Sequence, residues 1–302
     1  MTYPDLPAEV KSSLAREGHR THHHIWHFVR SKGSWDALPA ASRNQLSVQG
    51  WAAPRFNEEP GSGIDFLGMH RQMIEMTNEA LANAAQPDWL RVTGWDPIPW
   101  EEDNADWPVP DWNMAPPTWA SEELWQSFTE SAERARSQGR IQEMRQVAAA
   151  LLDPERLKSM TLDELGIAME WSVHGWMHMR WSGAPHSDSF STSPDNDWLF
   201  VPWSSHVNKV FWKLHGWIDK RIDDWAAATG QVVDLSNAWV GPNMPHHGMP
   251  HMASPALLSF LPSRESQPMP MGIRQHIVEG LLNLTVAPVS NSPQGSDKPL
   301  AF

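Results

Sequence analysis

Two pairs of histidines in this sequence share the same spacing. His23 and His27 are four residues apart, and His174 and His178 repeat that interval. On a helix, residues four apart lie one turn above each other on the same face, so each pair can direct two imidazoles toward one metal ion. Imidazole is the commonest neutral metal ligand in proteins. The spacing therefore predicts two helices that each present a metal-binding pair.

A single histidine follows each pair in a later helical segment. His70 follows the first pair, and His215 follows the second. Two imidazoles from one helix and one from a neighbouring helix make a three-nitrogen site that keeps coordination positions open. Two such half-sites facing each other across a bundle core can hold two metals close enough to act on one substrate. We therefore predict a dinuclear site with these six ligands: His23, His27, His70, His174, His178 and His215.

Helical patterns surround the first three of these histidines. Residues 8–32 lie between Pro7 and Gly33, residue types that commonly open and close a helix, and they predict one long helix. Apolar residues recur at helical spacing over residues 65–85 and predict a second helix, which carries the third histidine. Two neighbouring helices would therefore supply the first half-site.

The second half-site has equally clear helical signals. Thr161 and Glu164 form a capping box, which predicts the start of the helix that carries the second pair of histidines. A further long helix is expected to run to about Thr229, because Gly230 follows it. We expect that helix to hold His206 as well as the last predicted ligand.

The rest of the chain predicts loops and shorter helices. Residues 87–119 are rich in Pro, Trp and acidic side chains and predict a long loop, after which we expect helices at 122–137 and 140–151. No segment alternates as a strand does. The expected fold is mainly α, with a four-helix bundle core around the dinuclear site and long Pro- and Trp-rich loops. We expect one domain over residues 1–287 and a disordered tail at 288–302.

Composition limits the classes of partner. The net charge is −13 and no Lys/Arg stripe is visible, which argues against nucleic acid and anionic membranes as partners. Cysteine is absent, so any metal must be held by His, Asp or Glu. No secretory pattern opens the chain and no apolar run approaches a membrane span, so we expect a soluble, cytoplasmic protein. The 19 tryptophans are either core residues or the lining of an aromatic substrate pocket.

The segments around the histidines resemble a known family. His22–Val29, followed by Phe66–Ile74, resembles the first metal-binding half of the arthropod hemocyanins. His174–His178, followed by Phe211–Asp219, resembles the His-x3-His and Phe-x3-His-x3-Asp signature shared by hemocyanins and tyrosinases, the type 3 copper superfamily. The resemblance implies that the first three histidines bind one metal and the last three bind the other. It also implies that Asp219 orients its own helix or a ligand on it.

Within that superfamily, the chain is most similar to the small hemocyanin-like fungal cyclopenases. These bind zinc and convert cyclopenin-type benzodiazepinediones into viridicatin-type 4-arylquinolinones, with loss of an isocyanate-derived fragment. The resemblance implies a metal-dependent lyase of quinolone alkaloid biosynthesis that acts on a small aromatic substrate. His24 and His206 are then the candidate bases. Gly175 stands where tyrosinases have an asparagine, which disfavours phenol oxidation.

The sequence leaves two alternatives open. One is a phenol or aminophenol oxidase in which two copper ions replace zinc, and the other is an oxygen-binding protein that catalyses no reaction. The residues do not discriminate between zinc and copper, because imidazole binds both metals. Neither the substrate nor the oligomeric state can be read from the sequence.

Overall fold

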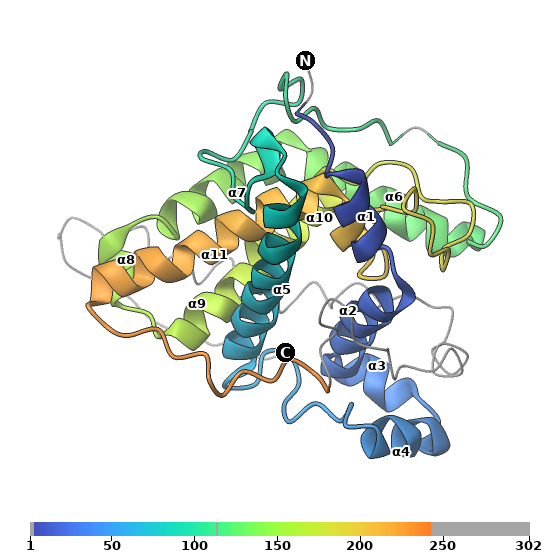
Figure 1. Ribbon diagram of the computed structural model, residues 1–302, viewed down its shortest axis with the longest axis horizontal. Coiled ribbons are helices and arrows are strands. Elements are labelled where there is room, and N and C mark those ends of the chain that lie inside the picture. Colours follow the sequence, from blue (N-terminus) through green and yellow to red (C-terminus); the bar gives the residue numbers. More distant parts are fainter. Residues whose placement is uncertain (1–2, 113, 243–302) are drawn as a thin grey trace, which may run out of the picture.

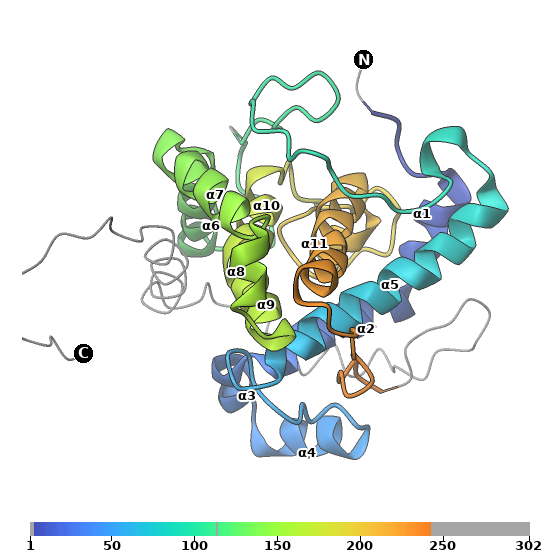
Figure 2. The same cartoon turned by 90° about the vertical axis from the view of Figure 1, so that its left-hand side faces the viewer.

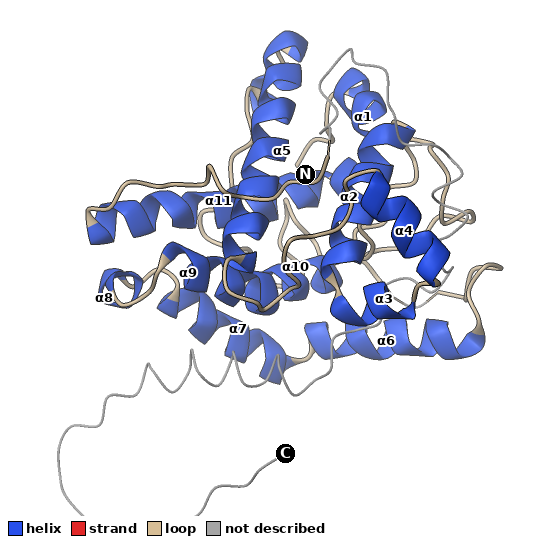
Figure 3. Ribbon diagram, turned by 90° about the horizontal axis from the view of Figure 1, so that it is seen from below, coloured by secondary structure: helices blue, strands red, loops and turns tan. Residues whose placement is uncertain are grey.

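The computed structural model describes residues 3–112 and 114–242 (Figure 1). These residues form helices and loops and contain no strand, as Figure 3 shows, so the predicted mainly α fold is confirmed. None of the helices described combines the length and apolar character that a membrane crossing requires. Residues 243–287 of the expected domain, and the expected tail at 288–302, lie outside the described residues.

The first helical region is divided. The prediction of one helix over residues 8–32 is wrong, because α1 covers Ala8–Leu14 and α2 covers Glu17–Arg30. Arg16 between them is extended, with φ −58° and ψ 142°, and an extended residue interrupts the i to i+4 hydrogen-bond ladder. A third helix, α3 (Lys32–Ala37), contains the glycine that was expected to close the first. Both histidines of the first pair still lie on α2.

The middle of the chain follows the prediction closely. The short helix η1 is the one regular element within the long Pro- and Trp-rich loop, over the residues that the structure describes there. The helices on either side of this loop, α5 (Ser62–Ala84), α6 (Glu122–Arg136) and α7 (Gln138–Ala150), lie close to their expected bounds. The helix before α5 is α4 (Ala40–Val48), and η1 within the loop covers Pro87–Trp89.

The second half of the described chain is more segmented than expected. The predicted capping box is present, with Thr161 and Glu164 bonded reciprocally. The helix that it starts changes to a π-helix before His174, and His206 lies in a separate 3-10 turn rather than in the last long helix. The segments are α8 (Pro154–Lys158), α9 (Leu162–Met169), the π-helix η2 (Glu170–His174), α10 (Gly175–Arg180), η3 (Ser205–Val207) and α11 (Lys209–Thr229).

Three helices form the centre of the molecule. α5 packs against α9 and α11, and Figure 2 shows α11 nearly end-on between α5 and the α8–α9 pair. At the α5–α9 contact, a Cβ atom on Gly63 would overlap the carbonyl oxygen of Asp163, and one on Gly166 would overlap the backbone of Gly63. Only glycine lets two helices approach backbone to backbone in this way. The separation of α5 and α9 is therefore fixed at this contact.

Tryptophan builds much of the interior. Of the buried hydrophobic side chains that the structure describes, fourteen are Trp, including Trp26, Trp176 and Trp217. A second aromatic cluster packs the loops around Trp112 and Trp198 against α6. A buried Trp contributes a large apolar area to the core. Of the two roles that the sequence left open, core packing accounts for these tryptophans.

Candidate metal centre

The structure brings the six predicted ligands into one cluster. They come from α2, α5, the η2–α10 segment and α11, so four helical segments meet at the histidines. Ring centroids are 4.8 Å apart for His23 and His27, 4.4 Å for His70 and His215, and 6.4 Å for His27 and His174. Segments far apart in the sequence thus direct imidazoles at a common volume.

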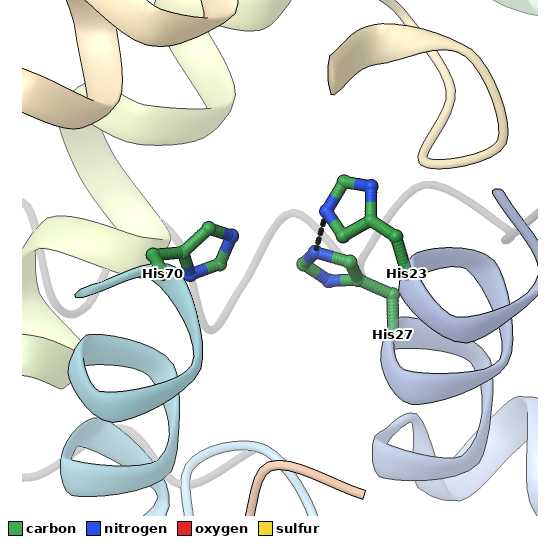
Figure 4. A group of neighbouring side chains, drawn as sticks. All are labelled: His23, His27 and His70. Carbon is green, nitrogen blue, oxygen red and sulfur yellow. Dashed lines mark hydrogen bonds between the residues drawn. The ribbon is translucent and has the colours of Figure 1, made fainter. Parts of the chain in front are cut away.

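The first three histidines form one compact group. His23, His27 and His70 each offer a ring nitrogen within 4.8 Å of the other two, and Figure 4 shows His70 facing the pair from α5. The Nε2 atoms of His23 and His27 are 3.2 Å apart. Two nitrogens bound tetrahedrally to one zinc at about 2.0–2.1 Å lie about 3.3–3.4 Å from each other. The pair is therefore already at the spacing that a shared metal requires.

The second group differs from the predicted trio. The nitrogens that lie within 4.8 Å of one another belong to His70, His174 and His215. The His70 ring stacks on His215 at an interplanar angle of 16° and so occupies the place expected for His178. His178 lies beside this group, with its ring centroid 4.6 Å from that of His174 and 5.4 Å from that of His215. His70 is therefore common to both groups.

Backbone carbonyls fix the orientation of the imidazoles. Nδ1 of His70 donates to the carbonyl oxygen of Phe66 at 2.8 Å, and Nδ1 of His215 donates to that of Phe211 at 2.8 Å. Each acceptor is four residues earlier on the same helix. A proton on Nδ1 leaves the lone pair on Nε2, which is the form that binds a metal.

Two further imidazoles are oriented by one loop. Nδ1 of His23 donates to the carbonyl of Pro202 at 2.7 Å, and Nδ1 of His178 donates to that of Leu199 at 2.7 Å. These acceptors precede η3 and lie far from both histidines in the sequence. They therefore could not be identified from the spacing of the histidines.

Three ring nitrogens in the cluster have no hydrogen-bond partner among residues 3–112 and 114–242. Nε2 of His70, His174 and His215 is buried in each case and unpaired. Leaving a buried polar atom unpaired costs about 1–3 kcal/mol, so such atoms are rare in folded proteins. The three nitrogens belong to the same compact group. One bound cation would give all three of them a partner.

Burial keeps the whole cluster neutral. It lowers the pKa of His70 to about 3 and that of His178 to about 4. Burial, followed by the neighbouring imidazoles, lowers the pKa well below its ordinary value in the other four ligands: His23, His27, His174 and His215. Neutral imidazoles keep their lone pairs at pH 7, so no proton has to leave before a metal binds.

The two candidate bases lie on different sides of α2. His24 is buried against the rings of Phe190 and Trp203 and belongs to neither group of ligand nitrogens. His206 is fully buried, with Nδ1 3.2 Å from Nδ1 of His23 and Nε2 3.1 Å from the carbonyl oxygen of Leu14. Both nitrogens of His206 are therefore occupied by protein contacts, which leaves none to take a proton from a substrate.

Asp219 contacts an arginine rather than an imidazole. Its Oδ1 accepts from Nε of Arg71 at 2.6 Å, and the same guanidinium reaches Asp223 at 3.1 Å. Arg71 lies on α5 and Asp219 on α11. Of the two roles implied for Asp219, the structure is consistent with the orientation of its helix, because the ion pair joins the two helices that carry His70 and His215.

A buried ion pair lies close to the cluster, and no motif in the sequence predicts it. Nη1 and Nη2 of Arg30 contact Oε1 and Oε2 of Glu170 at 2.8 and 3.1 Å. The guanidinium also lies 4.0 Å over the Trp26 ring. The backbone of Glu170 accepts a hydrogen bond from the His174 imidazole. The pair therefore joins α2 to the start of η2, and so links a residue near the first half-site to a ligand of the second.

The cluster reaches the surface at one edge. His27 and His178 are partly exposed, whereas the other four ligands are buried. Two surface grooves lie elsewhere, one beside Trp225 and the other beside Trp112 and Arg136. A small molecule would therefore approach the centre from the side of His27 and His178.

No protein-family model matches this chain, and no curated protein sequence matches it. The likeness to hemocyanins and tyrosinases accordingly remains a resemblance of the segments around the histidines. What the centre does has to be inferred from its ligands and their surroundings.

Proposed function

We propose that this protein is a metalloenzyme whose six clustered imidazoles hold a dinuclear centre. The observation that carries the proposal is the set of three buried, unpaired Nε2 atoms on His70, His174 and His215. A second observation supports the other half of the dinuclear centre. The Nε2 atoms of His23 and His27 already have the separation of two ligands on one metal. Histidines buried only for packing would be expected to pair both ring nitrogens.

The donor set favours Lewis-acid chemistry. Over the part of the chain that the structure describes, only imidazoles belong to the two groups, so no carboxylate there reduces the charge of a bound divalent cation. Zinc held by these neutral nitrogens with an open position would polarise a carbonyl oxygen and stabilise the negative charge that develops on it. The surrounding core, including the Phe211 ring at 3.8 Å from that of His215, buries four of the six ligands. Electrostatic stabilisation is strongest in such a buried site.

We therefore propose a zinc-dependent lyase of the cyclopenase type, which converts cyclopenin-like benzodiazepinediones into viridicatin-like 4-arylquinolinones. The substrate carbonyl would enter at the edge formed by His27 and His178, where the ligands are partly exposed. The residues Pro202 and Leu199 hold the Nδ1 protons of two ligands and so keep their Nε2 atoms directed inward. Since His206 has no free nitrogen, it acts in this proposal by holding His23 and not as a base.

A copper oxidase is the second candidate. The all-imidazole donor set favours it as well, because nitrogen ligands also suit copper. In that case two copper ions would occupy the same histidines and the protein would oxidise phenols or aminophenols. Gly175, which precedes the partly exposed edge at His178, replaces the asparagine expected in tyrosinases and favours the lyase.

Metal content and turnover test the proposal together. Purified protein loaded with zinc should bind two equivalents by elemental analysis and convert cyclopenin to viridicatin, measured by chromatography with mass detection. His215→Ala should lose the second equivalent and the activity. His186→Ala is the matched control and should lose neither. The His186 side chain bonds to the backbone of Asp188 in its own loop, and its carbonyl, which the substitution keeps, accepts from Trp119.

Two results would reject the proposal of a lyase at this centre. Full activity of His215→Ala would show that the reaction occurs elsewhere. Copper-loaded protein that consumes dioxygen and oxidises a diphenol, while the zinc form leaves cyclopenin unchanged, would select the oxidase. Binding of both metals without either turnover would leave the oxygen-binding alternative.

A further inference from the structure

One loop segment supplies an acceptor to a ligand from each half of the centre. Residues 193–204 contact the cluster through the carbonyls of Leu199 and Pro202, which lie three residues apart. Leu199 accepts the Nδ1 proton of His178, and Pro202 accepts that of His23. The orientation of both imidazoles therefore depends on where this single segment lies.

A buried arginine on α2 holds that segment. Arg20 is 0% exposed, and its Nη1 donates to the carbonyl of Trp203 at 3.1 Å. Its Nη2 donates to the carbonyls of Ser193 and Asn196, each at 2.8 Å. Its Nε donates to the carbonyl of Ala15 at 2.8 Å. Three of these four acceptors belong to the segment, and one of them directly follows Pro202.

The charge of Arg20 is balanced by carbonyl dipoles. No carboxylate accepts a hydrogen bond from its guanidinium among the described residues, and the nearby Asp197 pairs instead with Lys11 at 3.2 Å. Burial lowers the pKa of Arg20 to about 10, so the group stays protonated at neutral pH. A planar guanidinium can reach several carbonyls in fixed directions at once, whereas the ammonium of lysine cannot. The site therefore requires arginine for its geometry as well as its charge.

A second contact holds the same segment from within. Oγ of Ser204 is buried and donates to the carbonyl of Trp198 at 2.7 Å. The bond closes a turn around Leu199 and Pro202. The segment is therefore held in two ways. Arg20 on α2 bonds to three of its carbonyls, and Ser204 forms a hydrogen bond within the segment itself.

We propose that Arg20 is a positioning residue for both halves of the metal centre. By fixing residues 193–204 against α2, it sets the two carbonyls that orient His23 and His178. The inference rests on the proposed function, since it requires that these histidines bind metal. It adds a residue that touches no ligand and yet controls one on each side of the centre.

Cobalt(II) binding to Arg20→Lys tests this inference. Loss of the Arg20 guanidinium should let residues 193–204 shift. A change in the hydrogen-bond partner of a metal ligand typically weakens metal affinity by about 10–100-fold. We expect that loss for both cobalt equivalents in titrations of the full chain. We also expect the visible absorption of bound cobalt(II) to change in position and intensity, because it reports ligand geometry. Activity is not needed for either readout.

Arg221→Lys is the matched control. Arg221 is also a buried arginine, 2% exposed, and it follows His215 on the same helix. Its contacts run along α11, to Asp224 at 2.7 Å and over the Trp217 ring at 4.6 Å. The control should lower stability as a buried Arg-to-Lys change does, yet leave the cobalt affinity and spectrum as in the wild type.

Ser204→Ala keeps the test decisive if Arg20→Lys does not fold. It removes one hydroxyl from the same segment and should weaken both cobalt equivalents several-fold, with the same direction of spectral change. If the wild type binds cobalt, and Arg20→Lys and Ser204→Ala keep its affinity and spectrum, the inference is overturned while the metal centre stands. A wild type that binds no cobalt overturns the metal centre and this inference with it.

Discussion

Glu170→Gln should destabilise the protein more than any surface charge change. The carboxylate of Glu170 is buried and receives two hydrogen bonds from Arg30, which is 0% exposed. Arg30 also donates to the carbonyl of Ser62 at 2.8 Å. The amide keeps the shape of the carboxylate but removes its charge, so the buried guanidinium loses the carboxylate that it pairs with.

The expected loss can be estimated from the burial of the pair. Breaking a buried ion pair by removing one partner costs about 3–5 kcal/mol, because the remaining charge stays desolvated. For a chain of 302 residues, an unfolding entropy of about 2.1 cal/mol/K per residue gives about 0.6 kcal/mol/K. The melting temperature should therefore fall by about 5–8 °C.

Urea unfolding of the chelator-treated protein measures this loss directly. Glu155→Gln is the control, because Glu155 pairs with Lys158 at 2.6 Å on the surface, with side chains 80% and 50% exposed. Such pairs contribute little, so the control should stay within about 0.5 kcal/mol of the wild type. The double variant Arg30→Met/Glu170→Met should recover most of the lost stability, since apolar pairs often replace buried ion pairs without penalty.

One outcome would refute the reasoning. If Glu170→Gln unfolds within about 1 kcal/mol of the wild type, the Arg30 charge is not desolvated and the pair does not join α2 to η2 as described. A double variant that is less stable than Glu170→Gln would contradict the desolvation argument as well, because it would show that the uncompensated charge is not the source of the loss.

Two other predictions concern packing and pH. Gly63→Ala should destabilise by about 2–3 kcal/mol in thermal unfolding, because its Cβ would overlap the α9 backbone. Gly139→Ala, in the first turn of α7 with nothing within 4 Å, should stabilise by about 0.5 kcal/mol. In the metal-free chain, burial lowers the pKa values of His70 and His178 to about 3 and 4, below the value of 6.5 for an exposed histidine. Their stabilising contribution is therefore complete above pH 6.5 and is lost as the pH falls toward 3, which amounts to about 1.4 kcal/mol for each by pH 5.5. Equal urea midpoints at pH 8 and 5.5 would contradict this.

Local signals in the sequence were sufficient for most helices. The capping box at Thr161 and the glycine after α11 each mark a helix end through contacts between near neighbours. The proximity of His23 to His27 follows in the same way from helix geometry. These features were predictable because each depends on a few consecutive residues.

Features that depend on distant contacts were not predictable. The break between α1 and α2 coincides with a hydrogen bond from Arg20 to the carbonyl of Ala15, which competes with the helical ladder. The place of His178 beside the second group depends on the carbonyl of Leu199, from a loop with no motif. Spacing identifies which histidines share a helix face, but only the fold decides which nitrogens meet.

The glycine contact between α5 and α9 has a consequence for metal choice. His70 lies two helical turns beyond Gly63, and His174 lies a little over two turns beyond Gly166. These two ligands therefore extend from one rigid crossing, and their separation cannot widen unless a backbone contact opens. An ion with longer bonds to nitrogen must be accommodated by α2 and α11 alone. The selectivity of the centre for metal ions of a given radius would thus originate at two glycines, Gly63 and Gly166.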